Sequence, residues 1–61
     1  MVMKEAKETA LAMIQRHGMR ALAVAKEHAA EMQIAGNTEA ANRWGEISVA
    51  ISELRMLRRV N

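Results

Sequence analysis

Two histidines and one glutamate come closest to the spacing of a metal site. His17 and His28 lie eleven residues apart, which on a helix places them on nearly the same face but about 16 Å apart along the axis. One ion therefore cannot bridge them within a chain. His28 and Glu31 are spaced i, i+3 and could reach a common ion, but the chain holds no second pair of this kind. We expect no metal and no cofactor, and we expect His28 to be a hydrogen-bonded histidine at a helix interface.

Catalysis by acid–base or nucleophilic chemistry requires side chains that converge in a cleft. The chain has no Cys and no Asp that could orient a histidine, and 61 residues are few for an enzyme that buries a pocket. Among the hydroxyls, Thr38 is a candidate helix cap, and two serines lie near an apolar stripe. The four hydroxyl side chains are those of Thr9, Thr38, Ser48 and Ser52. We therefore predict that the protein is not an enzyme.

Arginines form the second candidate site. If the chain folds back on itself at 36–37, positions whose numbers sum to about 73 lie side by side. Five arginines then gather at the end opposite the turn and could bind phosphates or other anions. These are Arg16, Arg20, Arg55, Arg58 and Arg59. The ordinary alternative is that they stabilise helix C-termini, with Glu8 or Glu53 offsetting part of the charge.

The composition predicts an all-α fold. Ala, Leu, Met, Glu, Lys, Arg and Gln dominate, Pro is absent, and no stretch alternates with the period of a strand. Gly36 suits the left-handed position after a helix end, and Asn37 or Thr38 can cap the next helix. After the turn, apolar residues recur at spacings of three and four and form a main stripe, which predicts a helix over about 38–59. A weaker second apolar stripe on the same helix indicates burial against more than one neighbour. The main stripe is Ala40, Trp44, Ile47, Ile51 and Leu54, and the second is Val49, Met56 and Val60.

Before the turn, apolar and small residues recur at alternating spacings of three and four, which predicts one long helix over about 4–35. These residues are Leu11, Ile14, Gly18, Ala21, Ala25, His28, Met32 and Ala35. We favour the long helix, with a kink allowed at Gly18, because this phase continues through Gly18; a break there is the alternative. In the alternative, Gly18 ends a first helix and a three-helix unit results.

The pattern Arg16-His17-Gly18, followed by small residues, Gly36 and a tryptophan stripe, resembles short uncharacterised bacterial proteins found among the alphaproteobacteria. The stripe continues through Trp44, Ile47, Ala50-Ile51 and Leu54. No activity and no catalytic residues are assigned to these proteins, so the resemblance carries no function over to this chain.

The length and composition also bear on partners. The chain is one small domain over 1–61, and 12 of its residues are alanines, so a monomer has a small core. A hairpin with one long arm leaves an apolar overhang, including Leu11 and Ile14, and predicts a homodimer that closes a four-helix bundle. The six methionines either fill core gaps or offer adaptable surfaces to partner helices.

We therefore expect a helical protein-interaction module or accessory subunit, with a nucleic-acid-binding protein as the alternative. The formal net charge of +2 points only weakly to nucleic acid. No apolar run has the length of a membrane span, and the first residues lack a signal core, so we expect a cytoplasmic bacterial protein. The residues expected in the core or interface are Leu11, Ile14, Gly18, Ala21, Ala25, Met32, Trp44, Ile47, Ile51 and Leu54.

Overall fold

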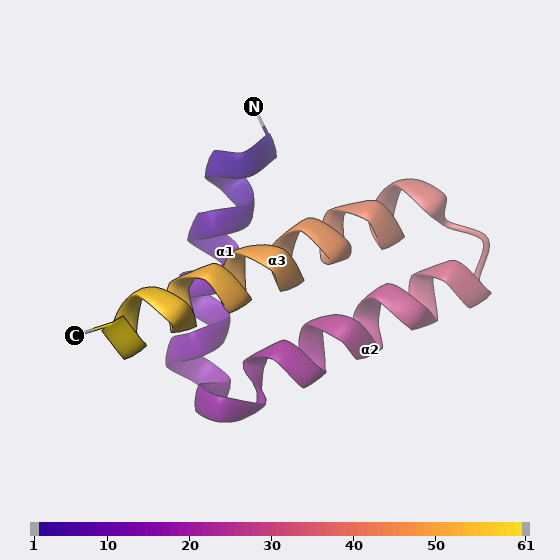
Figure 1. The fold of residues 1–61 in the computed structure, drawn as a ribbon. Coiled ribbons are helices and arrows are strands. Elements are labelled where there is room, and N and C mark those ends of the chain that lie inside the picture. Colours follow the sequence, from indigo (N-terminus) through magenta and orange to yellow (C-terminus); the bar gives the residue numbers. More distant parts are fainter. Residues whose placement is uncertain (1, 61) are drawn as a thin grey trace.

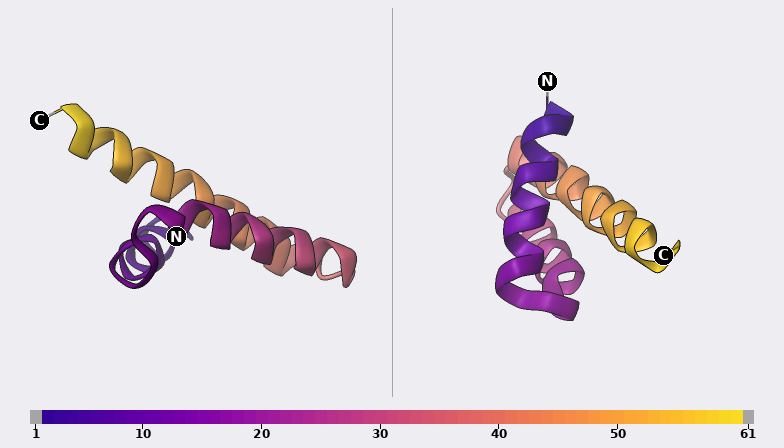
Figure 2. Two further views of the ribbon diagram at one scale, coloured as in Figure 1. Left: turned by 90° about the horizontal axis from the view of Figure 1, so that it is seen from below. Right: turned by 90° about the vertical axis from the view of Figure 1, so that its left-hand side faces the viewer.

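The computed structural model describes the backbone over residues 2–60 and the side chains over residues 4–57. The helices are α1 (Val2–His17), α2 (Ala21–Ile34) and α3 (Thr38–Val60), with a 3-10 turn at Gly18–Arg20 between α1 and α2. The predicted all-helical fold is confirmed for this part of the chain. Helices α2 and α3 run antiparallel and side by side, while α1 crosses α3 at a steep angle (Figure 1). Figure 2 shows the same arrangement from below and from the side.

A tight turn joins α2 to α3 where the sequence predicts it. Gly36 has a φ of 81°, and its N–H donates to the carbonyl of Gln33 at 3.0 Å. The next N–H, of Asn37, donates to the carbonyl of Met32 at 2.8 Å, so the last carbonyls of α2 are satisfied in the pattern of a Schellman motif. The Asn37 side chain then accepts from the N–H of Ala40 at 3.1 Å and caps α3. Asn37 therefore satisfies the end of α2 through its backbone N–H and caps the start of α3 through its side chain, which explains why the turn is short.

The favoured prediction of one long first helix is wrong. Gly18 has a φ of 60°, a left-handed conformation that ends α1 and changes the direction of the chain. The following 3-10 turn brings the N–H of Ala21 onto the carbonyl of Gly18, so α2 starts without a side-chain cap. A turn of three residues nearly completes one helical revolution, so the spacing of apolar residues keeps its phase although the helix axis bends. Periodicity alone therefore did not distinguish the two structures.

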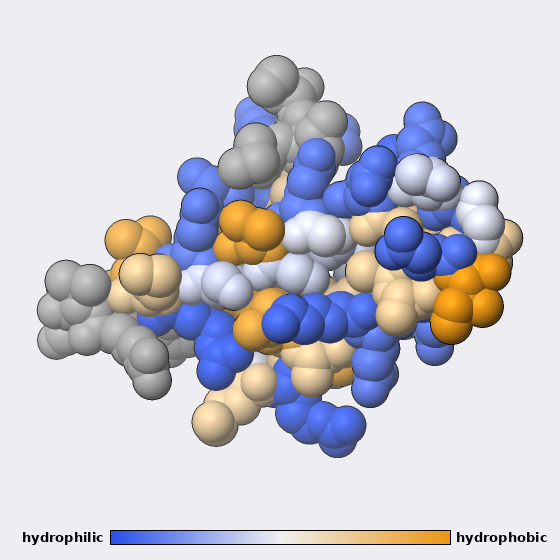
Figure 3. Space-filling view, turned by 45° about the vertical axis from the view of Figure 1, so that its right-hand side comes forward, coloured by the Kyte–Doolittle hydropathy of each residue, from blue (hydrophilic) through white to orange (hydrophobic). Residues whose placement is uncertain are grey.

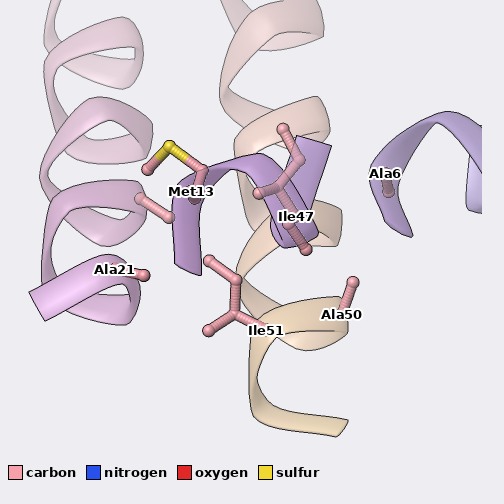
Figure 4. Packing of buried hydrophobic residues seen from close by; sticks show 8 residues of the cluster. Ala6, Met13, Ala21, Ile47, Ala50 and Ile51 are labelled. Atoms are coloured by element: carbon pink, nitrogen blue, oxygen red, sulfur yellow. The ribbon is translucent and has the colours of Figure 1, made fainter. Parts of the chain in front are cut away.

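Alanine dominates the core. All three helices contribute to it, and Ile51 is the largest side chain that is fully buried (Figure 4). Met13 and Ile47 are the other large buried side chains among the described residues. The buried cluster consists of Ala6, Ala10, Met13, Ala21, Ala25, Ile47, Ala50 and Ile51. Because alanine has only one side-chain carbon, the helices pack closely but bury little apolar surface in each contact.

The predicted overhang is corrected by this core, because α1 turns onto α3 and buries Ala6, Ala10 and Met13 within the chain. The second stripe of α3 is not covered by another helix of the same chain, because Val49 is 53% and Met56 65% exposed. Val60, the last member of that stripe, lies outside the described side chains.

The two glycines Gly18 and Gly45 provide a matched test of the break. Gly18→Ala should lower the free energy of unfolding by about 1–2 kcal/mol, because an L-residue resists the left-handed conformation. Gly45→Ala should raise it by about 0.5–1 kcal/mol, because Gly45 lies within α3 and an added Cβ meets nothing within 4 Å. Urea denaturation followed by circular dichroism measures both. A stabilising Gly18→Ala would mean that α1 and α2 form one continuous helix.

Candidate functional site

The most specific side-chain arrangement joins α2 and α3 through His28 and Trp44. Their rings stack with centroids 4.5 Å apart and planes inclined by 28°. Nδ1 of His28 also lies 3.6 Å from Oε1 of Glu31, so the imidazole is held between an aromatic face and a carboxylate. This contact fixes the register of the hairpin, since position 28 lies opposite position 44. The register agrees with the antiparallel pairing that the turn predicts.

The polar groups of this region do not converge on a reaction centre. The nearly buried hydroxyl of Ser48 donates to the carbonyl of Trp44 at 3.0 Å and is used within its own helix. Within the described residues, no three His, Cys, Asp or Glu side chains lie close enough together to hold a metal ion. The His28–Glu31 pair is a partly exposed contact between neighbouring turns of α2.

A groove that the sequence did not predict lies where α1 crosses α3. It has a volume of about 290 Å³ and is lined by Glu5, Ala6, Glu8, Thr9, Arg43 and Ile47. Arg43 shares this groove with two carboxylates, yet among the described residues only His28 and Glu31 approach within ion-pair distance. The groove depends on the crossing angle of α1, which no local pattern encodes. Its open sides and exposed charged groups suit weak electrostatic contact across the crossing.

A buried carboxylate oxygen is a local weakness of α3. Oε1 of Glu46 is inaccessible to solvent and has no hydrogen-bond partner among the described residues. A buried polar atom without a partner costs free energy because its hydration is lost and not replaced.

The residues predicted for the core or an interface fall into three groups in the structure. Ala21, Ala25, Ile47 and Ile51 are fully or almost fully buried. The partly buried residues are Ile14, Met32, Trp44 and Leu54, and all but Met32 pack against the central cluster. Leu11 is about half exposed, and Gly18 forms the exposed break.

Three of the five arginines predicted to gather opposite the α2–α3 turn have side chains that the structure describes. Arg16, in the last turn of α1, and Arg20, the last residue of the 3-10 turn, are exposed, and Arg55 is partly exposed on the last turns of α3. The α1–α2 corner and the C-terminal half of α3 both lie away from that turn (Figures 1 and 2). The side chains of Arg58 and Arg59 lie outside the described residues.

Large apolar side chains are also exposed on several helices. Ile34 beside the turn and Met19 at the corner are 87% and 84% exposed. Figure 3 shows hydrophobic side chains at separate places among hydrophilic ones on the face in view. The six exposed large residues are Leu11, Met19, Ile34, Val49, Met56 and Leu57.

Comparison with protein-family models, with curated proteins and with solved structures gives no match. In the part of the chain that the structure describes, no helix is both long enough and apolar enough to cross a membrane.

Removing the His28 ring should weaken the hairpin and change the environment of Trp44. His28→Ala should lower the free energy of unfolding by about 0.5–1.5 kcal/mol, the range for an aromatic pair. It should also shift the tryptophan emission spectrum, because Trp44 is the single fluorophore of its kind in the chain. His17→Ala, at the exposed end of α1, is the matched control. An emission spectrum that stays unchanged in His28→Ala would contradict the stacked geometry.

Glu46→Met should stabilise the protein. The substitution removes the unpartnered buried oxygen and keeps the length of the side chain, and we expect a gain of about 1 kcal/mol in the free energy of unfolding. Glu53→Met, one heptad further along α3 at an exposed position, should have a smaller effect. Equal effects of both substitutions in urea denaturation would show that burial of the oxygen is not the cause.

Proposed function

We propose that the protein is a small helical interaction module that acts by packing its helices against a second copy of itself. The supporting observation is the distribution of large apolar side chains over the described residues. Six are exposed, whereas only Met13, Ile47 and Ile51 are buried. Exposed apolar residues on so small a protein stabilise it best when a partner covers them.

The outer stripe of α3 is the surface that we assign to the second copy. Val49, Ser52 and Met56 follow spacings of three and four, so they share one helix face. Val49 and Met56 are more than half exposed, and Ser52 between them is partly exposed. Side chains of this size suit close packing of two helices. Pairing through α3 brings the two α2–α3 hairpins into a four-helix bundle, with each α1 crossing on the outside.

Charge on the outer stripe should dissociate the dimer. We expect the double variant Val49→Lys/Met56→Lys to weaken self-association at least tenfold, because both ammonium groups lose water in the interface. Sedimentation equilibrium measures the dissociation constant, and circular dichroism checks that the helices remain. Ile34→Lys, at the exposed end of α2, is the control and should leave the dissociation constant unchanged. A wild-type protein that sediments as a monomer at all concentrations would refute the proposal.

Nucleic-acid binding through the arginine end is the second candidate function. The supporting observation is that Arg16 and Arg20 are exposed in a segment, residues 9–26, that contains no Asp or Glu. Guanidinium groups bind phosphate through paired hydrogen bonds. The exposed Met19 between these arginines favours a different ligand, because a phosphate backbone offers it no apolar contact.

Binding to a short DNA duplex should fall steeply with salt if this second function holds. Fluorescence anisotropy at about 50 and 200 mM salt should then show a loss of affinity of at least tenfold, because phosphate contacts release counterions. Replacing Arg16 and Arg20 with Gln should abolish binding and leave the mass of the oligomer unchanged. Absence of binding at the lower salt concentration would exclude this function.

A further inference from the structure

We propose that the end of the molecule around the 3-10 turn binds an acidic amphipathic helix of a partner protein. This inference deepens the proposed interaction function and rests on it for the kind of contact, helix against helix. We use the name basic corner for Arg16, Met19 and Arg20; Arg55, further along α3, adds positive charge at the same end of the molecule. The partner is identified by its chemistry: carboxylates on its flanks and apolar residues along one face.

The geometry of the 3-10 turn exposes the side chains of the corner. The left-handed Gly18 ends α1, and the next two residues point away from the core before α2 begins. Met19 is consequently 84% exposed between two exposed arginines. None of the three residues of the 3-10 turn is buried. An unbroken helix would instead have spread these side chains along one rod.

The register of the hairpin places Arg55 at the same end. The stacked pair His28–Trp44 sets the pairing of α2 with α3, and counting outward from it puts position 51 opposite Ala21, the first residue of α2, so Arg55 lies about one helical turn beyond the start of α2. Arg55 is partly exposed there, so its guanidinium adds to the charge of Arg16 and Arg20.

The charge of this end is almost entirely of one sign. Residues 9–26 contain no Asp or Glu, and none follows Glu53. The only side-chain ion pair in the described part of the chain, His28–Glu31, belongs to the middle of the hairpin. The arginines of the corner therefore have their charge available to a partner. Opposed charge in a partner gives both attraction and orientation.

Exposed apolar surface distinguishes a helical peptide from other anionic partners. A thioether side chain adapts to irregular apolar surfaces and is typical of sites that accept helices of varied sequence. A duplex presents phosphates at its surface and gains nothing from Met19. A second copy of this chain, brought corner to corner by a two-fold axis, would set like charges against each other. An acidic amphipathic helix satisfies the guanidinium groups and the methionine together.

The experiment uses the full chain labelled with ¹⁵N and a synthetic 18-residue helical peptide of Leu and Glu, with Leu on one face. Its counterpart carries Lys at every Glu position. We expect the acidic peptide to shift the amide resonances of residues 16–20, and the Lys peptide to leave them in place. Arg16→Gln/Arg20→Gln should weaken binding at least fivefold, and Met19→Ser about threefold. The matched control, Lys4→Gln/Lys7→Gln, removes the same charge from the other end of α1 and should change affinity less than twofold.

Each alternative has its own outcome. Equal shifts with both peptides, or none with either, would overturn the proposal. Tighter binding of a 15-base-pair duplex that Met19→Ser leaves unchanged would assign the corner to nucleic acid instead. Stronger binding to vesicles containing anionic lipid than to the peptide would assign it to a membrane surface. Sedimentation of the same samples measures dimerisation through α3 separately. A failure of peptide binding at the basic corner is therefore distinguished from a failure of self-association.

Discussion

The left-handed conformation of Gly18 is the constraint on which the rest of the structure depends. It ends α1 and redirects the chain, so that α1 crosses α3 and does not extend the line of α2. That crossing buries Ala6, Ala10 and Met13 against Ile47 and its neighbours. Without it, α2 and α3 would form a two-helix hairpin with one side of α3 uncovered. A residue without a Cβ adopts this conformation at little cost, so one glycine decides whether the chain forms a rod or a three-helix unit.

The alanine content of the core has a consequence for the surface. Alanine allows helices to approach closely, but each buried methyl group contributes little hydrophobic free energy. Ile51 is the largest fully buried side chain, so the core buries few large apolar residues. Val49 and Met56 lie on the outer face of α3, where they are more than half exposed and contribute little to the stability of a monomer. The high alanine content thus allows close packing of the helices, and it also leaves large apolar side chains exposed that a partner could cover.

Local signals determined how much of the structure could be predicted from the sequence. Gly36 and Asn37 were predictable because their roles depend on neighbouring backbone groups, namely the Schellman hydrogen bonds and the cap on Ala40. The core stripe of α3 was predictable because it repeats over several turns. Gly18 was ambiguous because Met19 and Arg20 provide no cap, and α2 starts through a backbone hydrogen bond that any residue can make. The groove between Glu5 and Arg43 was unpredictable, since it exists only through the crossing angle of α1.

The break at Gly18 also connects the core with the proposed binding surface. The 3-10 turn that directs α1 onto α3 is the segment that presents Met19 and its two flanking arginines to solvent. A partner that binds this corner only in the bent chain would add its binding free energy to the stability of the bent chain over a straight one. The reverse holds by linkage: any change that straightens the chain at Gly18 removes the surface and uncovers the core at once. If the proposed partner binds, stability and recognition depend on one turn, and a substitution in it is expected to change both together.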